Sequence, residues 1–382
     1  MKCVRDRIDA AAPQIQQALC SYEAAHPGSL NREIIHRHAV GLARFINACG
    51  LSGLLFDNED NRIETDIKLV NAAGSNKNGE IPSRVLRDLG FDRASYGTVT
   101  HLPWKGNTDQ AGPLAQRIWM YPDSASMVNF LGLPGIGSLA VAENLRRDKS
   151  CLPRTINLMA TPSCACVEER ITDIIQTMKS IRPHLNGEDK WELNISCPNT
   201  QGHDGNHQRE VFQRELDDLL CEIYQVADLP MDIKLSPDTA ADDFSRIIEV
   251  VSMYRHLKNE DRKKTMAKES GRFVTGFTTF NTTAKRGEYG IPADLRTPGG
   301  ASGDAVYRLA LIKQRAFATA MTALGTEHQF TINIVGGIDT VARLRDRVEA
   351  AAPARVAECH LYTPLIYKGP GLLRSLRRYQ AK

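Results

Sequence analysis

The sequence predicts a (β/α)8 TIM barrel, an α/β fold, with a small N-terminal helical extension. After about residue 62, short β-branched runs alternate with helix-length segments, an order typical of parallel strands joined by crossover helices. Eight such units occur, the number that a closed barrel needs. Polar residues and glycines collect where the predicted strands end, at the rim on which such barrels build their sites. The alternative is an open doubly wound sheet, but no Gly-x-Gly-x-x-Gly turn follows the first strand.

The predicted elements follow in chain order. Residues 1–62 form the extension, with helical periodicity over 8–25 and 31–49 and a polar linker at 57–62, and the barrel takes 63–382. The eight predicted strands are 66–73, 93–100, 154–160, 191–197, 231–236, 272–280, 330–335 and 358–362. The predicted helices are 81–89, 167–181, 211–226, 242–257, 305–323, 341–351 and 371–379. Residues 138–147 and 258–271 are expected to be insertions.

Composition excludes several classes of function. The 382 residues carry a formal net charge of only +3, which gives no case for nucleic acid as a partner. Nine cysteines without a Cys-x-x-Cys pair favour a reducing, cytoplasmic location. The mixed charges of the first residues are unlike a signal peptide, and no apolar run reaches the roughly 18 residues that span a bilayer. No residues complete a metal site around Cys164 and Cys166, so no metal is expected.

The stretch after the fourth predicted strand carries the most informative chemistry. Asn194 and Asn199 flank Cys197, and Pro198 ends regular structure there. A pair of carboxamides can hold a flat heterocycle through its ring N–H and C=O groups. A thiol between them could act as a base or nucleophile on that ring. A free cysteine is often only a small buried hydrophobic residue, but a loop position favours function.

Two lysines belong to the same predicted rim. Lys234 interrupts an apolar strand, and a cation beside a conjugated redox ring would stabilise the negative charge gained on reduction. Lys77 lies in a loop, where it could be a surface residue or a clamp for a substrate carboxylate. Glycine-rich segments at 299–303 and 336–337, with Tyr362 and Thr363, indicate turns that feed helix N-termini and cradle a phosphate.

An ordered set of short motifs resembles the dihydroorotate dehydrogenase family, over residues 66 to 382. The motifs are Ala72-Ala73-Gly74 with Lys77-Asn78-Gly79-Glu80, Gly97-Thr98-Val99-Thr100, Asn194-Ile195-Ser196-Cys197-Pro198-Asn199-Thr200, Asn281-Thr282-Thr283, Gly299-Gly300 with Ser302-Gly303, Val335-Gly336-Gly337-Ile338, Leu361-Tyr362-Thr363 and Lys368-Gly369-Pro370. Each motif is weakly specific, whereas the ordered set is highly specific.

The resemblance implies an FMN-dependent barrel that oxidises dihydroorotate to orotate in pyrimidine biosynthesis. Cys197 would take the proton from C5 while hydride leaves C6 for the flavin. The implied substrate-binding residues are Lys77, Asn129, Asn194, Asn199, Asn281 and Thr282. The implied FMN-binding residues are Ala73, Gly74, Lys77, Thr98, Asn157, Asn194, Lys234, Gly303, Gly337, Tyr362 and Thr363.

Features of two subclasses are mixed. The N-terminal helices and the turn at 77–80 are similar to the quinone-reducing, membrane-associated class, whereas Cys197 and the loop 129–134 are nearer the soluble class. A quinone is the favoured electron acceptor, and the N-terminal helices are candidates for peripheral contact with the inner face of a membrane. The alternatives are a related flavin barrel for another dihydropyrimidine, a tRNA dihydrouridine reductase, which the near-neutral charge disfavours, and a barrel without catalysis that serves as a scaffold.

Overall fold

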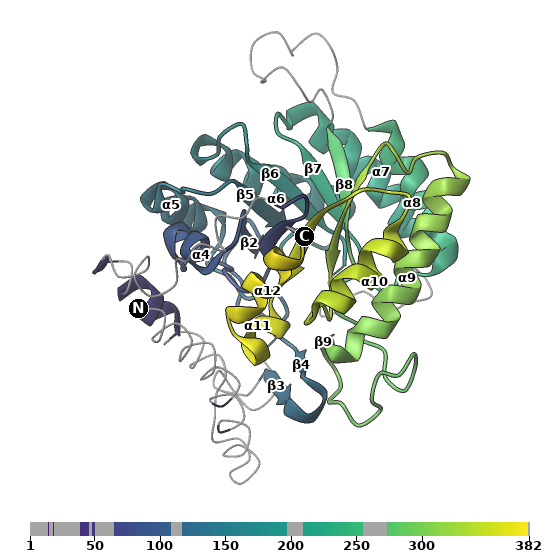
Figure 1. Ribbon diagram of the computed structural model, residues 1–382. Helices are drawn as coiled ribbons and strands as arrows, with labels where there is room; N and C mark the ends of the chain where they lie inside the picture. Colours follow the sequence, from purple (N-terminus) through teal and green to yellow (C-terminus); the bar gives the residue numbers. More distant parts are fainter. Residues whose placement is uncertain are drawn as a thin grey trace.

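The computed structural model describes residues 65–107, 117–196, 209–254 and 273–380, with residues 14, 18, 39–45 and 48–49 of the N-terminal segment. Its centre is an eight-stranded sheet in the order β1-β11-β10-β8-β7-β6-β5-β2, in which all pairs are parallel (Figure 1). A parallel bridge between Val70 and Arg93 brings its two edges together. The predicted (β/α)8 barrel is confirmed. Its strands are β1 (Lys68–Asn71), β2 (Ala94–Val99), β5 (Arg154–Leu158), β6 (Lys190–Asn194), β7 (Met231–Lys234), β8 (Val274–Thr279), β10 (Thr331–Val335) and β11 (Val356–Leu361).

Helices surround the barrel (Figure 1). The seven predicted helices of the barrel are present, two of them with the predicted bounds. The helices are α4 (Ser83–Leu89), α5 (Ser138–Asp148), α6 (Val167–Ile181), α7 (Arg209–Val226), α8 (Ala241–Met253), α9 (Asp304–Ala323), α10 (Val341–Ala351), α11 (Thr363–Lys368) and α12 (Gly371–Gln380). None of the helices in the described ranges is long and apolar enough to cross a membrane.

One predicted insertion is wrong. Residues 138–147 belong to α5, which follows β2 in the barrel's order and packs beside α6. Val141, Ala142 and Leu145 form its buried apolar stripe, whereas Leu139 is exposed and the last three residues of the helix are charged. A stripe this narrow gives a weak periodic signal in the sequence. The other predicted insertion, 258–271, lies outside the described residues, as do the linker 57–62 and most of the predicted N-terminal helices.

A second, antiparallel sheet has the order β3 (Ile118–Tyr121), β4 (Ser126–Asn129), β9 (Gly300–Gly303). The glycine-rich segment at 299–303 was expected to be a turn, and it is largely strand β9, paired with β4 and running straight into α9. Ala301 packs in a small apolar cluster with Val128 and Ile291, so this sheet has a core of its own. Glycine is needed at both ends of β9, because a Cβ on Gly299 would meet the carbonyl oxygen of Asn129 at 2.8 Å and a Cβ on Gly303 that of Ala125 at 2.4 Å.

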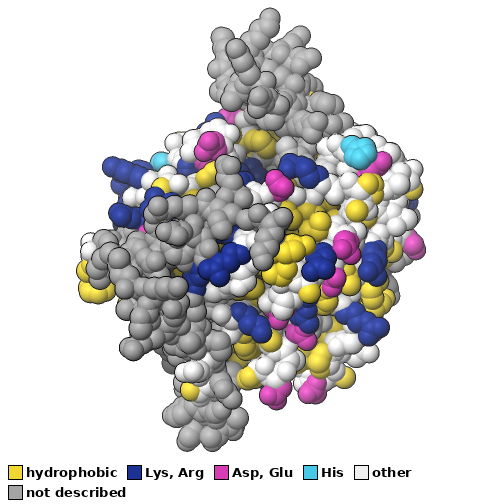
Figure 2. Space-filling model, in the orientation of Figure 1, with side chains coloured by type: hydrophobic (Ala, Val, Ile, Leu, Met, Phe, Trp, Pro, Cys, Tyr) yellow, Lys and Arg dark blue, Asp and Glu magenta, His cyan; other side chains and the backbone are white. Residues whose placement is uncertain are grey.

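The barrel interior is polar, while the main hydrophobic core lies between strands and helices. Along β6, Trp191 and Leu193 belong to that core, so the alternation of a strand turns Glu192 and Asn194 into the barrel. On β11, Cys359 is in the core and the buried Glu358 and His360 lie on the opposite face. On the surface shown in Figure 2, basic and acidic side chains are interspersed among apolar ones.

Candidate functional site

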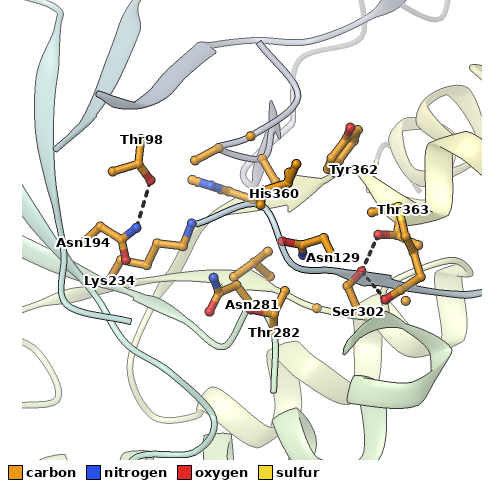
Figure 3. Close-up of a pocket in the computed structure, with 18 of the residues that line it drawn as sticks. Thr98, Asn129, Asn194, Lys234, Asn281, Thr282, Ser302, His360, Tyr362 and Thr363 are labelled. Carbon is orange, nitrogen blue, oxygen red and sulfur yellow. Dashed lines mark hydrogen bonds between the residues drawn. The ribbon is translucent and has the colours of Figure 1, made fainter. Parts of the chain in front are cut away.

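A pocket opens where the barrel strands end, and the second sheet forms one of its walls. Residues at or just after the ends of β1, β2, β6, β7, β8, β10 and β11 line it, and Met127 and Asn129 of β4 face it from the second sheet. Figure 3 shows the labelled polar side chains converging on this space from separate elements. The rim predicted from the sequence is therefore one contiguous site.

Most of the predicted site residues line this pocket. They are Ala73, Gly74, Lys77, Thr98, Asn129, Asn194, Lys234, Asn281, Thr282, Gly303, Gly337, Tyr362 and Thr363. Asn157 is not among the lining residues. It is fully buried on β5, where its carboxamide oxygen accepts a hydrogen bond from Thr98 and its amide group donates to Glu192. Cys197 and Asn199 lie outside the described residues.

The described part of the loop after β6 is anchored to the pocket wall. Asn194, the last residue of β6, donates from Nδ2 to Thr98 Oγ1 at 2.9 Å. Its Oδ1 accepts from the backbone N–H of Ser196 at 3.0 Å and from the Ser196 hydroxyl at 2.7 Å. The backbone that leads to residue 197 is thus fixed against two lining side chains.

The opposite end of the pocket is a tight corner of glycines and hydroxyls. Ser302 Oγ and Thr363 Oγ1 lie 2.9 Å apart. A Cβ on Gly303 would meet the carbonyl oxygen of Ala125 at 2.4 Å, and a Cβ on Gly337 would meet that of Gly303 at 2.8 Å. Both glycines have positive φ, 78° and 72°. Only glycine allows these backbones to approach so closely, just before the N-terminus of α9.

An unsatisfied acceptor lies in the wall between these two ends. Asn281 Oδ1 is buried and has no hydrogen-bond partner among the described residues. A buried carboxamide oxygen without a partner is costly, so such an atom in a pocket wall points to a ligand that donates to it. The pocket therefore combines three features. They are a glycine and hydroxyl corner of the kind that binds phosphate, several carboxamide side chains, and a buried acceptor, Asn281 Oδ1, without a donor.

Beneath the pocket, the barrel interior holds a network of charges. Lys234 Nζ lies 4.0 Å from Glu192 Oε1. Burial alone would raise the pKa of Glu192, but Lys234 and His360 outweigh it and hold that pKa below its usual value. Glu358 behaves in the same way: burial opposes its charge, yet Lys190 and His360 hold its pKa well below the usual range. Both carboxyl groups are therefore ionised.

Two polar lining residues, His360 and Ser302, were not predicted as site residues. His360 lines the pocket, and its Nε2 lies 2.9 Å from Glu358 Oε2. Period-2 alternation could have found it, because Glu358 and His360 are two residues apart on one strand face. Ser302 was quoted within a motif but given no role. Burial raises the pKa of Tyr362 to about 12, so its phenol stays neutral at the pocket edge.

Comparison with known proteins places the chain in a family. The dihydroorotate dehydrogenase family model matches residues 63–379. The chain belongs to the dihydroorotate dehydrogenase family. Curated proteins named dihydroorotate dehydrogenase (quinone) are similar to it. The protein from Haloarcula marismortui is 26% identical over 310 residues, covering 80% of this chain and 75% of that one. The protein from Corynebacterium diphtheriae is 29% identical over 314 residues, covering 80% and 73%.

Solved structures of the same family share the fold. The crystal structure of DHODH from Eimeria tenella in complex with ferulenol aligns with a TM-score of 0.68 at 21% identity. The alignment covers 91% of this chain and 89% of that chain. The dihydroorotate dehydrogenase motifs found in the sequence thus fall on a barrel of the fold that this family has.

Proposed function

We propose that this chain oxidises dihydroorotate to orotate in pyrimidine biosynthesis, with FMN as its redox cofactor. One observation carries the proposal: a row of carboxamides, two lysines and a glycine corner line a single pocket at the mouth of a dihydroorotate dehydrogenase barrel.

The pocket residues fit FMN. The corner formed by Gly303, Gly337 and Thr363 suits a phosphate, because closely packed backbone precedes the N-terminus of α9 there. Toward the other end, Thr98, Asn194 and Lys234 suit the polar edge of a flavin ring. Asn157 would act from below by holding the Thr98 hydroxyl, and Ala73, Gly74, Lys77 and Tyr362 complete the set. Bound FMN would supply the two-electron acceptor for the substrate's hydride.

The remaining groups suit a cyclic imide with a carboxylate. Asn129, Asn194, Asn281 and Thr282 offer donors and acceptors for ring N–H and C=O groups, and Lys77 offers a charge for the carboxylate. In the proposed reaction Cys197 takes the C5 proton, and Asn199 binds the ring. The support for both comes from the sequence, since Cys197 directly follows the anchored Ser196 and Asn199 lies two residues further on.

A quinone is the proposed electron acceptor, since the curated relatives are named dihydroorotate dehydrogenase (quinone). We also propose that residues 1–62 form an extension separate from the barrel at 63–382, and that this extension touches a membrane surface. Leu42 and Phe45, on the described helical piece 39–45, have exposed fractions of 59% and 62%, which suits such contact.

Anaerobic mixing with dihydroorotate tests the proposal. The purified protein should be yellow, its absorbance near the usual ~450 nm flavin band should bleach, and a soluble quinone should restore it faster than fumarate or NAD. Cys197→Ala should keep the flavin but slow bleaching by about 10²–10⁴-fold, the usual contribution of a general base, while Cys197→Ser should slow it less. A colourless protein, or unchanged bleaching by Cys197→Ala, would contradict the proposal or the role of Cys197 respectively.

The substrate's carboxylate has its own test. Lys77→Ala should cripple bleaching by dihydroorotate, whereas bleaching by a dihydropyrimidine without the carboxylate should change little. If Lys77→Ala turns over dihydroorotate normally, the substrate is another dihydropyrimidine.

A further inference from the structure

Arg347 of helix α10 is a buried cation that lies behind the pocket wall. Its side chain is fully buried. One end of the guanidinium, Nη1, donates to the carbonyl oxygens of Val335 at 3.1 Å and Gly336 at 3.2 Å, and both of these residues line the pocket. The other end, Nη2, donates to the carbonyl oxygen of Thr279 at 2.9 Å and to Gln314 Oε1 at 3.2 Å. The cation is therefore held directly against the turn that follows β10.

The charge of Arg347 is not balanced by a carboxylate. All of its hydrogen-bond acceptors in the described structure are neutral, and its Nε has no partner there. Burial lowers the pKa of Arg347, but only to about 10, so the guanidinium stays positive at neutral pH. Gln314, on the neighbouring helix α9 (Figure 1), is an amide and not a carboxylate. A buried, unpaired charge is costly, and an anionic ligand on the other side of the wall would offset that cost.

The contact of Arg347 with the wall also orients two backbone donors. A trans peptide is planar, and its N–H and C=O point in opposite directions. The carbonyls of Val335 and Gly336 accept from Arg347 through trans peptides. The N–H groups of the same two peptides, those of Gly336 and Gly337, therefore point away from the guanidinium. Neither N–H donates to another described residue, and both glycines line the pocket at positive φ, 101° and 72°. Successive N–H groups in such a turn form a site for an anion.

A cation behind these peptides strengthens their donors. Positive charge at a carbonyl oxygen polarises the peptide group and makes its N–H a better donor, and the effect is larger where the interior screens charge poorly. The phosphate is the group of the proposed cofactor that carries a full negative charge. We propose that Arg347 is a positioning residue that acts through the Gly336–Gly337 turn, strengthens its N–H donors toward a phosphate, and so makes this chain prefer FMN over riboflavin, the same flavin without the phosphate. The inference rests on the proposed cofactor but not on the identity of the substrate.

Gln314→Glu tests the charge without removing a contact. The new carboxylate still accepts from Arg347 and from the Thr279 hydroxyl, which donates to Gln314 Oε1 at 2.6 Å in this structure. It also supplies the missing negative charge beside the guanidinium, so the free energy of unfolding of the flavin-free protein should stay equal or rise. FMN binding should weaken by about tenfold, the scale of one charge-assisted hydrogen bond, while riboflavin binding should change little. Titration of the full-length protein, freed of flavin by dialysis, with each flavin measures the affinities by flavin fluorescence, and urea denaturation measures stability.

Two further variants separate charge from packing. Arg347→Lys keeps the positive charge but loses the planar fork that holds several carbonyls, so stability should fall while the preference for FMN remains. Arg345→Gln is the matched control for net charge, because it lowers that charge by one, as Gln314→Glu does. Arg345 is an exposed residue of the same helix that lies over the ring of Tyr379 and does not line the pocket. Its replacement should change neither affinity.

The inference is overturned if FMN binding is unchanged in Gln314→Glu, or if it weakens together with riboflavin binding, because the role of Arg347 would then be structural. A loss of the FMN preference in Arg347→Lys but not in Gln314→Glu also overturns it, as does a wild-type protein that binds both flavins equally or binds neither. Failure of the proposed function gives a different result. A wild-type protein that prefers FMN, but whose flavin dihydroorotate does not reduce, would contradict the proposed function and leave this inference standing.

Discussion

Two asparagines with buried side-chain atoms show how one residue type can serve stability or binding. Asn71 ends β1 with its carboxamide satisfied: it donates to Ser75 Oγ and to the Ser95 carbonyl, and it accepts from the Ser95 N–H. Asn281 lines the pocket with a buried Oδ1 that lacks a partner in the described structure. An unsatisfied buried acceptor costs about 1–3 kcal/mol of stability. Asn71 therefore stabilises the fold, whereas Asn281 lowers the stability of the ligand-free protein.

Asn281→Ala should therefore leave the free energy of unfolding of the ligand-free protein unchanged or slightly higher, while orotate binding weakens at least tenfold. Asn71→Ala should do the reverse, lowering the free energy of unfolding by roughly 1–3 kcal/mol with a smaller effect on binding. Urea denaturation and calorimetric titration with orotate measure both quantities. A large loss of stability in Asn281→Ala would mean that its acceptor is satisfied within the protein.

Many of the proposed site residues were predictable because they lie at or near the end of a barrel strand. Thr98, Asn194 and Lys234 each interrupt or end an apolar run, and parallel strands bring such positions to one rim. His360 was missed because strand β11 was predicted from its residue types and not from the alternation of its faces. The role of Asn157 beneath the pocket depends on its contact with Thr98, which no local pattern specifies.

At the scale of elements, alternation predicted the strands and helices of the barrel but not the second sheet. The pairing of β4 with β9 joins residues about 170 positions apart, for example Val128 with Ala301. Periodicity within a short window contains no information on such pairing. Gly303 has a structural role that the sequence pattern does not reveal, because only glycine lets the end of β9 pass close to Ala125 before α9 begins.

Gly303→Ala tests that reading against Gly325→Ala. Both glycines have positive φ, 78° and 63°, but a Cβ on Gly325 meets nothing within 4 Å. Gly325→Ala should lower the free energy of unfolding by roughly 1–2 kcal/mol, the cost of the backbone conformation. Gly303→Ala should lower the free energy of unfolding by more than Gly325→Ala does. It should also reduce the flavin content of the purified protein, because the added Cβ forces the backbone around Gly303 and Ala125 apart. Equal losses in both variants, with full flavin content, would remove the corner from the proposed phosphate site.

For the whole molecule, the barrel is stabilised from two sides that respond differently to pH. The apolar layer between strands and helices is insensitive to protons, whereas the interior network of Glu192, Glu358, Lys190 and Asp232 is ionic. The pKa of Lys190 is raised because Asp232 and Glu358 outweigh the burial that opposes its charge. We therefore expect acid to destabilise this protein by protonating the carboxylates inside the barrel.

Glu358→Gln tests this. Because the folded pKa of Glu358 is well below 4.5, its ionised form stabilises the native state above about pH 4.5, and that contribution is lost as pH falls further. At pH 7 the variant leaves Lys190 and Arg93 short of a partner and should be less stable by about 3–5 kcal/mol. The difference in free energy of unfolding between wild type and Glu358→Gln should become smaller as pH falls toward 3.5. Urea denaturation at each pH measures it.

Glu143→Gln is the matched control at the surface. Arg146 and Arg147 lower the pKa of Glu143 to about 2, through hydrogen bonds that are partly exposed to solvent. Solvent and salt screen such pairs, so the variant should change stability little, and less at high ionic strength. The difference in free energy of unfolding between Glu358→Gln and wild type could instead stay constant from pH 7 to pH 3.5. Glu358 would then stabilise the barrel by packing and not by its charge.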